Sequence, residues 1–210
     1  MTSLDIFADP VCPWCLIGKV ELDRALESRP AHPFRIVWHP FRLNGGMPPE
    51  GMDRIEFLRL KLGDRAEEAS RAVARRAAAL GLVLNPSPRE PDTTDAHRLM
   101  HWAGLEGAQT RVMSGLLHAH WQEARDIGDR DDLVRIAQAA GMDGGLTRRL
   151  LDSDADRAEV QAREAHARQR GIASVPTFIV AGRHAVAGAQ SADLWRRVID
   201  DLSDQSPKVI

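Results

Sequence analysis

Two cysteines separated by two residues, in the segment Cys12-Pro13-Trp14-Cys15, carry the clearest chemistry in the sequence. Thiols at this spacing on the first turn of a helix can close a small disulfide ring and exchange it with another disulfide. The free N–H groups and partial positive charge of a helix N-terminus favour the thiolate form. Cys12 precedes the expected helix, so we predict that it is exposed and acts as the nucleophile. Cys15 lies one turn into the helix and is predicted to be the more buried, resolving thiol.

The main alternative is that this cysteine pair forms half of a zinc site. The other is that the two thiols take part in no chemistry. A structural zinc site needs four ligands, usually from two such pairs, whereas this sequence has two cysteines in all. His97 and His101 lie one helical turn apart and could share a metal, but they lack an adjacent glutamate and a clear third ligand. We therefore expect redox chemistry and no metal site.

The elements around the cysteines are predicted to form a βαβ unit. Residues 3–8 alternate between apolar and polar side chains and end at Asp9-Pro10, which is typical of a strand followed by a turn. Pro13 suits the first turn of a helix, and the helical apolar spacing continues to about Ser28. Residues 34–39 read as a second strand, which places the cysteines at the turn from strand to helix.

The middle of the chain is predicted to be helical and its end to return to strands. Asp53 is expected to cap one helix, and Thr93 or Thr94 another. Another expected helix ends at Leu80, and further helices are expected over residues 108–124, 131–140, 146–151 and 154–170. Strands are expected at 176–180 and 184–187, joined by a short hairpin, before a final helix that Gln190 or Ser191 caps. This order predicts an α/β domain interrupted by a helical insertion, from about Asn44 to Arg168.

The composition excludes several classes of protein. The 210 residues are 43% hydrophobic and 28% charged, with a formal net charge of −2. Acidic and basic residues are mixed, so we expect no nucleic-acid partner. No apolar run has the length of a membrane span, and the N-terminus lacks the pattern of a secretory signal. We therefore expect a cytoplasmic protein, in which a cysteine pair is more often catalytic than structural.

Several segments resemble DsbA-like proteins of the FrnE type. Asp9-Pro-Val-Cys-Pro-Trp-Cys-Leu-Ile-Gly18 is similar to their active-site segment, and residues 94–102, 125–128, 171–178 and 188–190 resemble further motifs along nearly the whole chain. The resemblance implies a thioredoxin-like fold (βαβ…ββα) with a large all-helical insertion. It divides the chain into a thioredoxin-like domain (1–43 and 169–210) and an insertion domain (44–168).

The resemblance also implies further site residues. Val175–Pro176 is expected to be a cis peptide that faces the cysteines, with the Val175 backbone pairing with an extended substrate; from the residues alone, Pro176 could equally open an edge strand. Pro13 and Trp14 are expected to contact substrate. From the residues alone, His97 is expected to hydrogen-bond within the insertion, with proton transfer to the cysteines as the alternative. Trp14 stands where the better-known periplasmic oxidants have histidine, so we expect no strongly oxidising potential.

The predicted function is that of a thiol–disulfide oxidoreductase, a disulfide reductase or isomerase. Its partners would be protein or small-molecule thiols and disulfides, with no membrane partner, as a monomer or homodimer. It would need no cofactor beyond the redox-active disulfide, with glutathione as an alternative co-substrate.

One other interpretation is a glutathione-dependent isomerase or transferase of the chromene-carboxylate isomerase or kappa type, although those proteins typically have serine at the position of Cys12. The last is a peptide-binding, chaperone-like module. Large aromatic residues (Trp38, Phe41, Trp102 and Trp121) are expected in the core, with a substrate groove as the alternative.

Overall fold

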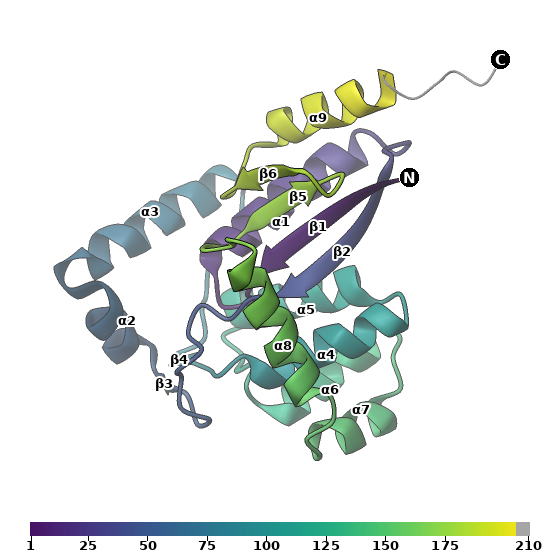
Figure 1. Ribbon diagram of the computed structural model, residues 1–210. Coiled ribbons are helices and arrows are strands. Elements are labelled where there is room, and N and C mark those ends of the chain that lie inside the picture. Colours follow the sequence, from purple (N-terminus) through teal and green to yellow (C-terminus); the bar gives the residue numbers. More distant parts are fainter. Residues whose placement is uncertain (205–210) are drawn as a thin grey trace.

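The computed structural model describes residues 1–204 and combines a small sheet with helices on both of its faces (Figure 1). The elements are, in chain order, β1 (Thr2–Ala8), α1 (Pro13–Glu27), β2 (Phe34–Pro40), β3 (Met52–Asp53), α2 (Arg54–Leu62), η1 (Gly63–Arg65), α3 (Ala66–Ala79), β4 (Arg89–Glu90), α4 (Thr94–Leu105), α5 (Gln109–Gln122), α6 (Arg130–Ala139), α7 (Gly144–Leu151), α8 (Arg157–Gln169), β5 (Thr177–Val180), β6 (His184–Ala187) and α9 (Ala192–Asp204).

The main sheet has the strand order β2-β1-β5-β6. β1 runs parallel to β2 and antiparallel to β5, which in turn pairs antiparallel with β6. Ala181 and Gly182 have φ values of 54° and 69°, and this pair of positive values gives a hairpin connection that follows the twist of the strands. The βαβ…ββα order expected from the sequence is therefore confirmed.

Alternation along the strands assigns side chains to the two faces of the sheet. Phe178 packs against Trp195 of α9 with ring centroids 4.7 Å apart, and α1 lies beside α9 on this face. Phe7 stacks on His39, its partner in the register, on the opposite face. α8 packs against β2 on that second face, and its C-terminal end lies in front of the arrowheads of β1 and β2 in Figure 1. The helix that begins with the cysteine pair and α8 are thus on opposite sides of the sheet.

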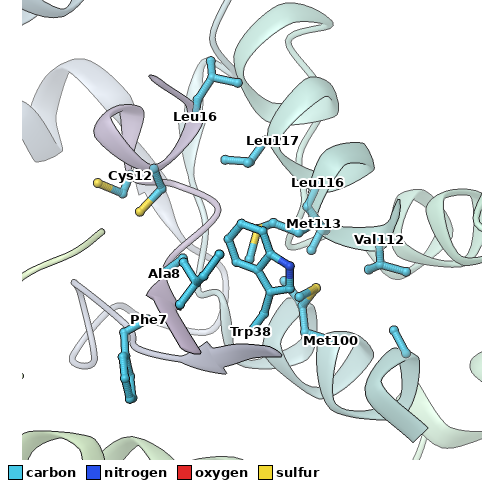
Figure 2. Packing of buried hydrophobic residues seen from close by; sticks show 14 of the residues in the cluster. Phe7, Ala8, Cys12, Leu16, Trp38, Met100, Val112, Met113, Leu116 and Leu117 are labelled. Carbon is cyan, nitrogen blue, oxygen red and sulfur yellow. The ribbon is translucent and has the colours of Figure 1, made fainter. Parts of the chain in front are cut away.

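The helical block α4 to α7 meets the β2 edge of the sheet through α4 and α5. The backbone N–H of Trp38 donates to Gln109 Oε1 (2.9 Å), and Gln109 Nε2 donates to the Trp38 carbonyl (3.0 Å), so one amide side chain replaces a neighbouring strand. The indole of Trp38 lies among Met100, Met113 and Leu116 (Figure 2). All four large aromatic residues considered for a groove are buried, which confirms the core interpretation: Trp38, Phe41, Trp102 and Trp121.

Arg98 joins the helices of this block from inside the core. Its side chain is fully buried and donates to the carbonyls of Ala155 (2.7 Å), Leu150 (2.6 Å) and Ser153 (2.7 Å). The same guanidinium pairs with Asp95 at 2.7 Å. A buried arginine is tolerated here because its donors are matched by these fixed acceptors.

The two helices α2 and α3 form an arm that is attached by a small contact. α2 has no buried residue, and α3 buries only Val73 and Ala77. Val73 belongs to a small apolar cluster with Ile17 and Leu80 that is separate from the main core. Arg24 of α1 adds a hydrogen bond to the Leu80 carbonyl (2.6 Å). The arm therefore rests on the side of α1 (Figure 1).

Two local details differ from the sequence predictions. Asp53 does cap α2 and accepts from two backbone N–H groups. Thr93, one of the two predicted candidates, is the N-cap residue of α4, but its side chain makes no capping hydrogen bond. Instead Asp92 Oδ1 accepts from the Thr94 N–H at 2.6 Å, because its longer carboxylate reaches forward from the preceding loop. The paired two-residue strands β3 and β4 were not expected, since neither has a strand-length pattern of its own.

The division into 1–43 with 169–210 and 44–168 stays a prediction. All of α8 except its last residue, Gln169, lies in the second range, and the helix packs against both β2 and α4, so it contacts both parts. Within residues 1–204, no helix combines the length and the apolar character needed to cross a bilayer.

Candidate active site

The cysteine pair lies at the N-terminus of α1, where the sequence places it. Cys12 is the N-cap residue in extended conformation, and Pro13 occupies the first helical position. The Cys12 N–H donates to the Asp9 carbonyl at 2.9 Å, and the Cys15 N–H donates to the Cys12 carbonyl at 3.0 Å. Both thiols are free. A tight turn therefore holds the two sulfur atoms on the first turn of the helix.

Cys12 is buried, so the expectation that it is exposed is wrong. Its relative exposure is 3%, against 2% for Cys15, while Trp14 between them is 39% exposed. The cover is the loop before β5, because Cys12 Sγ donates to the Val175 carbonyl at 3.6 Å. This contact joins residues that are far apart in the sequence, and a local pattern contains no sign of it.

The Val175–Pro176 peptide bond is cis, as the resemblance implies. Pro176 also approaches α1 closely, since a Cβ added to Gly18 would lie 3.1 Å from Pro176 Cγ. Gly18 therefore leaves room for the loop to reach the cysteines. The structure brings together Cys12, Cys15, Val175 and Pro176, with Pro13 and Trp14 on the same turn.

The two thiols differ in their electrostatic environment. Burial is the largest cause that raises the pKa of the Cys15 thiol well above its ordinary value, and the neighbouring Cys12 thiol adds to it. The charge of Asp9 raises that pKa further. Cys15 consequently keeps its proton when the pair is reduced.

A buried acidic residue and a buried histidine lie beneath the cysteines. Asp9 is fully buried and His97 is 2% exposed, with Asp9 Oδ1 at 3.5 Å from His97 Nε2. The other oxygen, Asp9 Oδ2, accepts from the Leu43 N–H at 2.7 Å. Oδ1 and Nε2 have no closer polar partner within residues 1–204. His97 was identified from the sequence and Asp9 was not, although a carboxylate directly before the cysteine turn is a usable signal.

The loop side of the site contains a second buried carboxylate, Glu90. It pairs with Arg54 (2.6 Å) and accepts from Asn44 (3.2 Å). Burial outweighs these contacts and raises the pKa of Glu90 to about 7, with a further contribution from Asp9. The Arg54 guanidinium lies 4.6 Å from the centroid of the Trp121 ring. Arg54 thus links the β3–β4 pair to the helical block.

Trp121 supports the active-site turn directly. Its indole N–H donates to the Pro10 carbonyl at 3.1 Å, two residues before Cys12. This bond satisfies a carbonyl that would otherwise be buried without a partner. The helical block therefore contributes both a wall of the core and a fixed contact to the turn.

The two histidines that were considered for a metal have different partners. His97 faces Asp9, whereas His101 Nδ1 lies 3.2 Å from a guanidinium nitrogen of Arg163. No group of three or more His, Cys, Asp or Glu side chains within the described residues is arranged to hold a metal ion.

A family model and several known proteins match this chain. The model of the DSBA-like thioredoxin domain matches residues 3–200. The uncharacterized protein YwbO of Bacillus subtilis (strain 168) is 26% identical over 204 residues, which are 94% of this chain and 96% of that protein. The crystal structure of a probable DsbA oxidoreductase from Streptomyces coelicolor has a TM-score of 0.86 at 27% identity, covering 100% of this chain and 93% of that one.

Two more distant structures show the same fold. The cytosolic disulfide reductase DsbM of Pseudomonas aeruginosa has a TM-score of 0.70 at 20% identity and covers 97% of this chain and 100% of its own. A second structure of DsbM contains GSH. A 2-hydroxychromene-2-carboxylate isomerase has a TM-score of 0.75 at 16% identity, covering 99% of both chains. At these identities the likeness concerns the architecture and not the reaction.

Proposed function

Because the chain belongs to the DSBA-like thioredoxin domain family, we propose that it is a protein disulfide reductase or isomerase. Cys12 is the nucleophile and Cys15 the resolving thiol. The observation that carries this assignment is the asymmetry of the pair. Cys15 has a raised pKa, whereas the Cys12 thiol contacts the Val175 carbonyl next to the cis proline.

The proposed cycle transfers two electrons from the cysteine pair to a substrate disulfide. The Cys12 thiolate attacks one substrate sulfur, a mixed disulfide forms, and the other substrate sulfur leaves as a thiolate. Cys15 then loses its proton and attacks the Cys12 sulfur. The mixed disulfide breaks, the second substrate sulfur leaves as a thiol, and the Cys12–Cys15 disulfide remains. Two molecules of an external thiol, for which glutathione is our candidate, reduce this disulfide for the next cycle and leave as their own disulfide.

Asp9 and His97 are proposed to take the proton from Cys15. A thiol whose pKa is raised by burial needs an acceptor close by when it attacks. Asp9 is the carboxylate whose charge acts on Cys15, and its Oδ1 and His97 Nε2 have no hydrogen bond within residues 1–204. In Asp9→Asn and His97→Asn, the mixed disulfide is expected to persist longer, whereas exposed His118→Asn on α5 should leave its lifetime unchanged. Equal lifetimes in all four proteins would contradict this role.

The burial of Cys12 favours an extended polypeptide as substrate. A substrate must replace the contact between the Cys12 sulfur and the Val175 carbonyl, and a backbone N–H can then donate to that carbonyl. Trp14, the exposed residue of the turn, offers an apolar surface beside the sulfur. The cytosolic setting of DsbM is consistent with our proposal of a cytoplasmic reductase.

The test is to trap the mixed disulfide. Cys15→Ser should accumulate a covalent adduct with a disulfide-containing peptide through Cys12, detected by intact-mass spectrometry, and Cys12→Ser should form none. Wild type should form the intramolecular disulfide reversibly in glutathione buffers. Absence of both the adduct and the reversible disulfide would refute the proposal. Turnover of a small electrophile with glutathione, without turnover of peptide disulfides, would favour the isomerase or transferase alternative.

A further inference from the structure

A cavity of about 410 Å³ lies between α8 and the sheet face opposite α1 and α9. Asp5, Phe7, His39 and Ile179 form its floor, and residues of one face of α8 form its wall. The register pairs Phe7 with His39 and Asp5 with Ile179, so the four floor residues share one face of the sheet. The cysteines begin a helix that packs on the other face. The cavity is therefore separate from the proposed active site.

A chain of hydrogen bonds fixes the polar side of the cavity. His39 Nε2 donates to Asp5 Oδ1 at 2.8 Å, which leaves Nδ1 as an acceptor. Arg163 approaches that Nδ1 at 3.4 Å and the Nδ1 of His101 at 3.2 Å. Burial is the largest cause that lowers the pKa of His39, so its ring stays neutral in this arrangement. The network thus holds the guanidinium of Arg163 at the cavity.

The cationic groups of the wall lack acidic partners. Arg163 and Arg170 form no ion pair with a carboxylate within residues 1–204. His166 lies between them on the same face of α8. Glu159, the acidic residue of this wall, is about 16 Å from Arg170 along the helix axis at about 1.5 Å per residue. The half of the cavity nearest the end of α8 is therefore positive.

Phe7 and Ile179 supply the apolar part of the floor. The rings of Phe7 and His39 are stacked at 20° with centroids 4.7 Å apart, so they face each other and do not lie side by side in one plane. On the opposite wall, the small side chains of Ala162 and Ala167 leave space for a ligand. From this combination we propose that the cavity binds a small molecule with an apolar body and one carboxylate. The body lies on the Phe7–Ile179 floor and the carboxylate binds Arg163 and Arg170.

The acidic residues of the cavity favour a monoanion over a phosphate dianion. Asp5 on the floor and Glu159 on the wall place two carboxylates near the same space. A second negative charge on the ligand would be repelled by both of them, whereas a single carboxylate can be matched by the guanidinium pair.

The test uses 2-naphthoate as the probe, with binding followed by titration calorimetry and by backbone amide NMR shifts. We expect saturable binding, with shifts at Phe7, Ile179 and Ala162. Ala162→Leu fills the cavity from an exposed helical position without removing a native contact, and it should abolish binding. Arg163→Gln should weaken binding about tenfold or more, the effect of losing one charged hydrogen bond. Arg149→Gln, an exposed arginine of α7 outside the cavity, is the matched control and should bind like wild type.

Two further measurements decide the ligand class and the location. Cys12→Ser should bind naphthoate unchanged, so the result is independent of the proposed oxidoreductase function. Equal binding of 2-naphthylmethylamine, or tighter binding of 2-naphthyl phosphate, would overturn the monocarboxylate assignment. Shifts confined to the cysteine turn, undiminished binding to Ala162→Leu, or no binding at all would overturn the site.

Discussion

Glu90 gives the protein a stability that is expected to depend on pH in one direction. Its carboxyl is 3% exposed, and burial raises its pKa from 4.5 to about 7. Between these two values the folded state holds a proton on Glu90 that the unfolded state has released. The folded state therefore binds more protons, and the free energy of unfolding falls as pH rises through this window. Above a pH of about 7 the contribution is constant.

The size of this effect follows from the two pKa values. At about 1.4 kcal/mol for each tenfold change in equilibrium, the step from 4.5 to about 7 corresponds to about 3 kcal/mol. Glu90→Gln cannot release this proton, and its amide oxygen can still accept from Arg54 or Asn44. The difference in unfolding free energy, wild type minus Glu90→Gln, should therefore decrease by about 3 kcal/mol from about pH 4 to about pH 8.

Urea denaturation followed by tryptophan fluorescence measures this difference, because urea adds no ionic strength to screen charges. Glu68→Gln, on an exposed position of α3, is the control for the loss of one surface carboxylate. A wild-type minus Glu90→Gln difference that stays constant with pH would refute the reasoning. An increase with pH would show that the Arg54 pair outweighs burial.

Three other substitutions test the packing. Arg98→Met should cost about 4 kcal/mol in urea unfolding, because it removes the donor of the Ala155 and Ser153 carbonyls and one partner of the Arg98–Asp95 ion pair. Exposed Arg149→Met should cost less than about 0.5 kcal/mol. Trp102→Phe should lower the free energy of unfolding by about 1–2 kcal/mol more than Trp195→Phe. The Trp102 indole donates to Asp156 at 2.8 Å, while the Trp195 indole N–H has no partner within residues 1–204. Equal losses of unfolding free energy would contradict this. Asp53→Ala should reduce the stability of α2 by about 1 kcal/mol, measured by amide hydrogen exchange, because its carboxylate accepts from two N–H groups at the helix start; unchanged exchange in α2 would show that this cap contributes nothing.

Local sequence patterns predicted the elements and the place of the cysteines. The strand before Asp9, the proline at the first position of α1 and the short hairpin at Ala181 are each specified by a few neighbouring residues. The features that local patterns could not supply depend on residues far away in the sequence. Cys12 is covered by Val175, 163 positions away, and His39 meets Arg163, 124 positions away. No short pattern contains such a contact.

The same difference explains two details near the site. Thr93 occupies the predicted N-cap position of α4, but the loop geometry places the carboxylate of Asp92, and not the Thr93 hydroxyl, against the free N–H group. Asp9 reads as part of a strand-ending turn, and its role beneath the cysteines becomes visible only when α4 brings His97 against it. Tertiary packing decides both.

The separate apolar cluster under the α2–α3 arm has a consequence for how the molecule opens. Ile17, Val73 and Leu80 form a buried cluster apart from the main core, and the residues that pack against both clusters, such as Val20 and Leu82, are only partly buried. The arm can therefore detach while the sheet stays folded. Its amides should exchange with deuterium through such sub-global openings, at a lower free energy than the amides of β1. Each opening would uncover one side of α1, the helix that holds Cys15, without global unfolding.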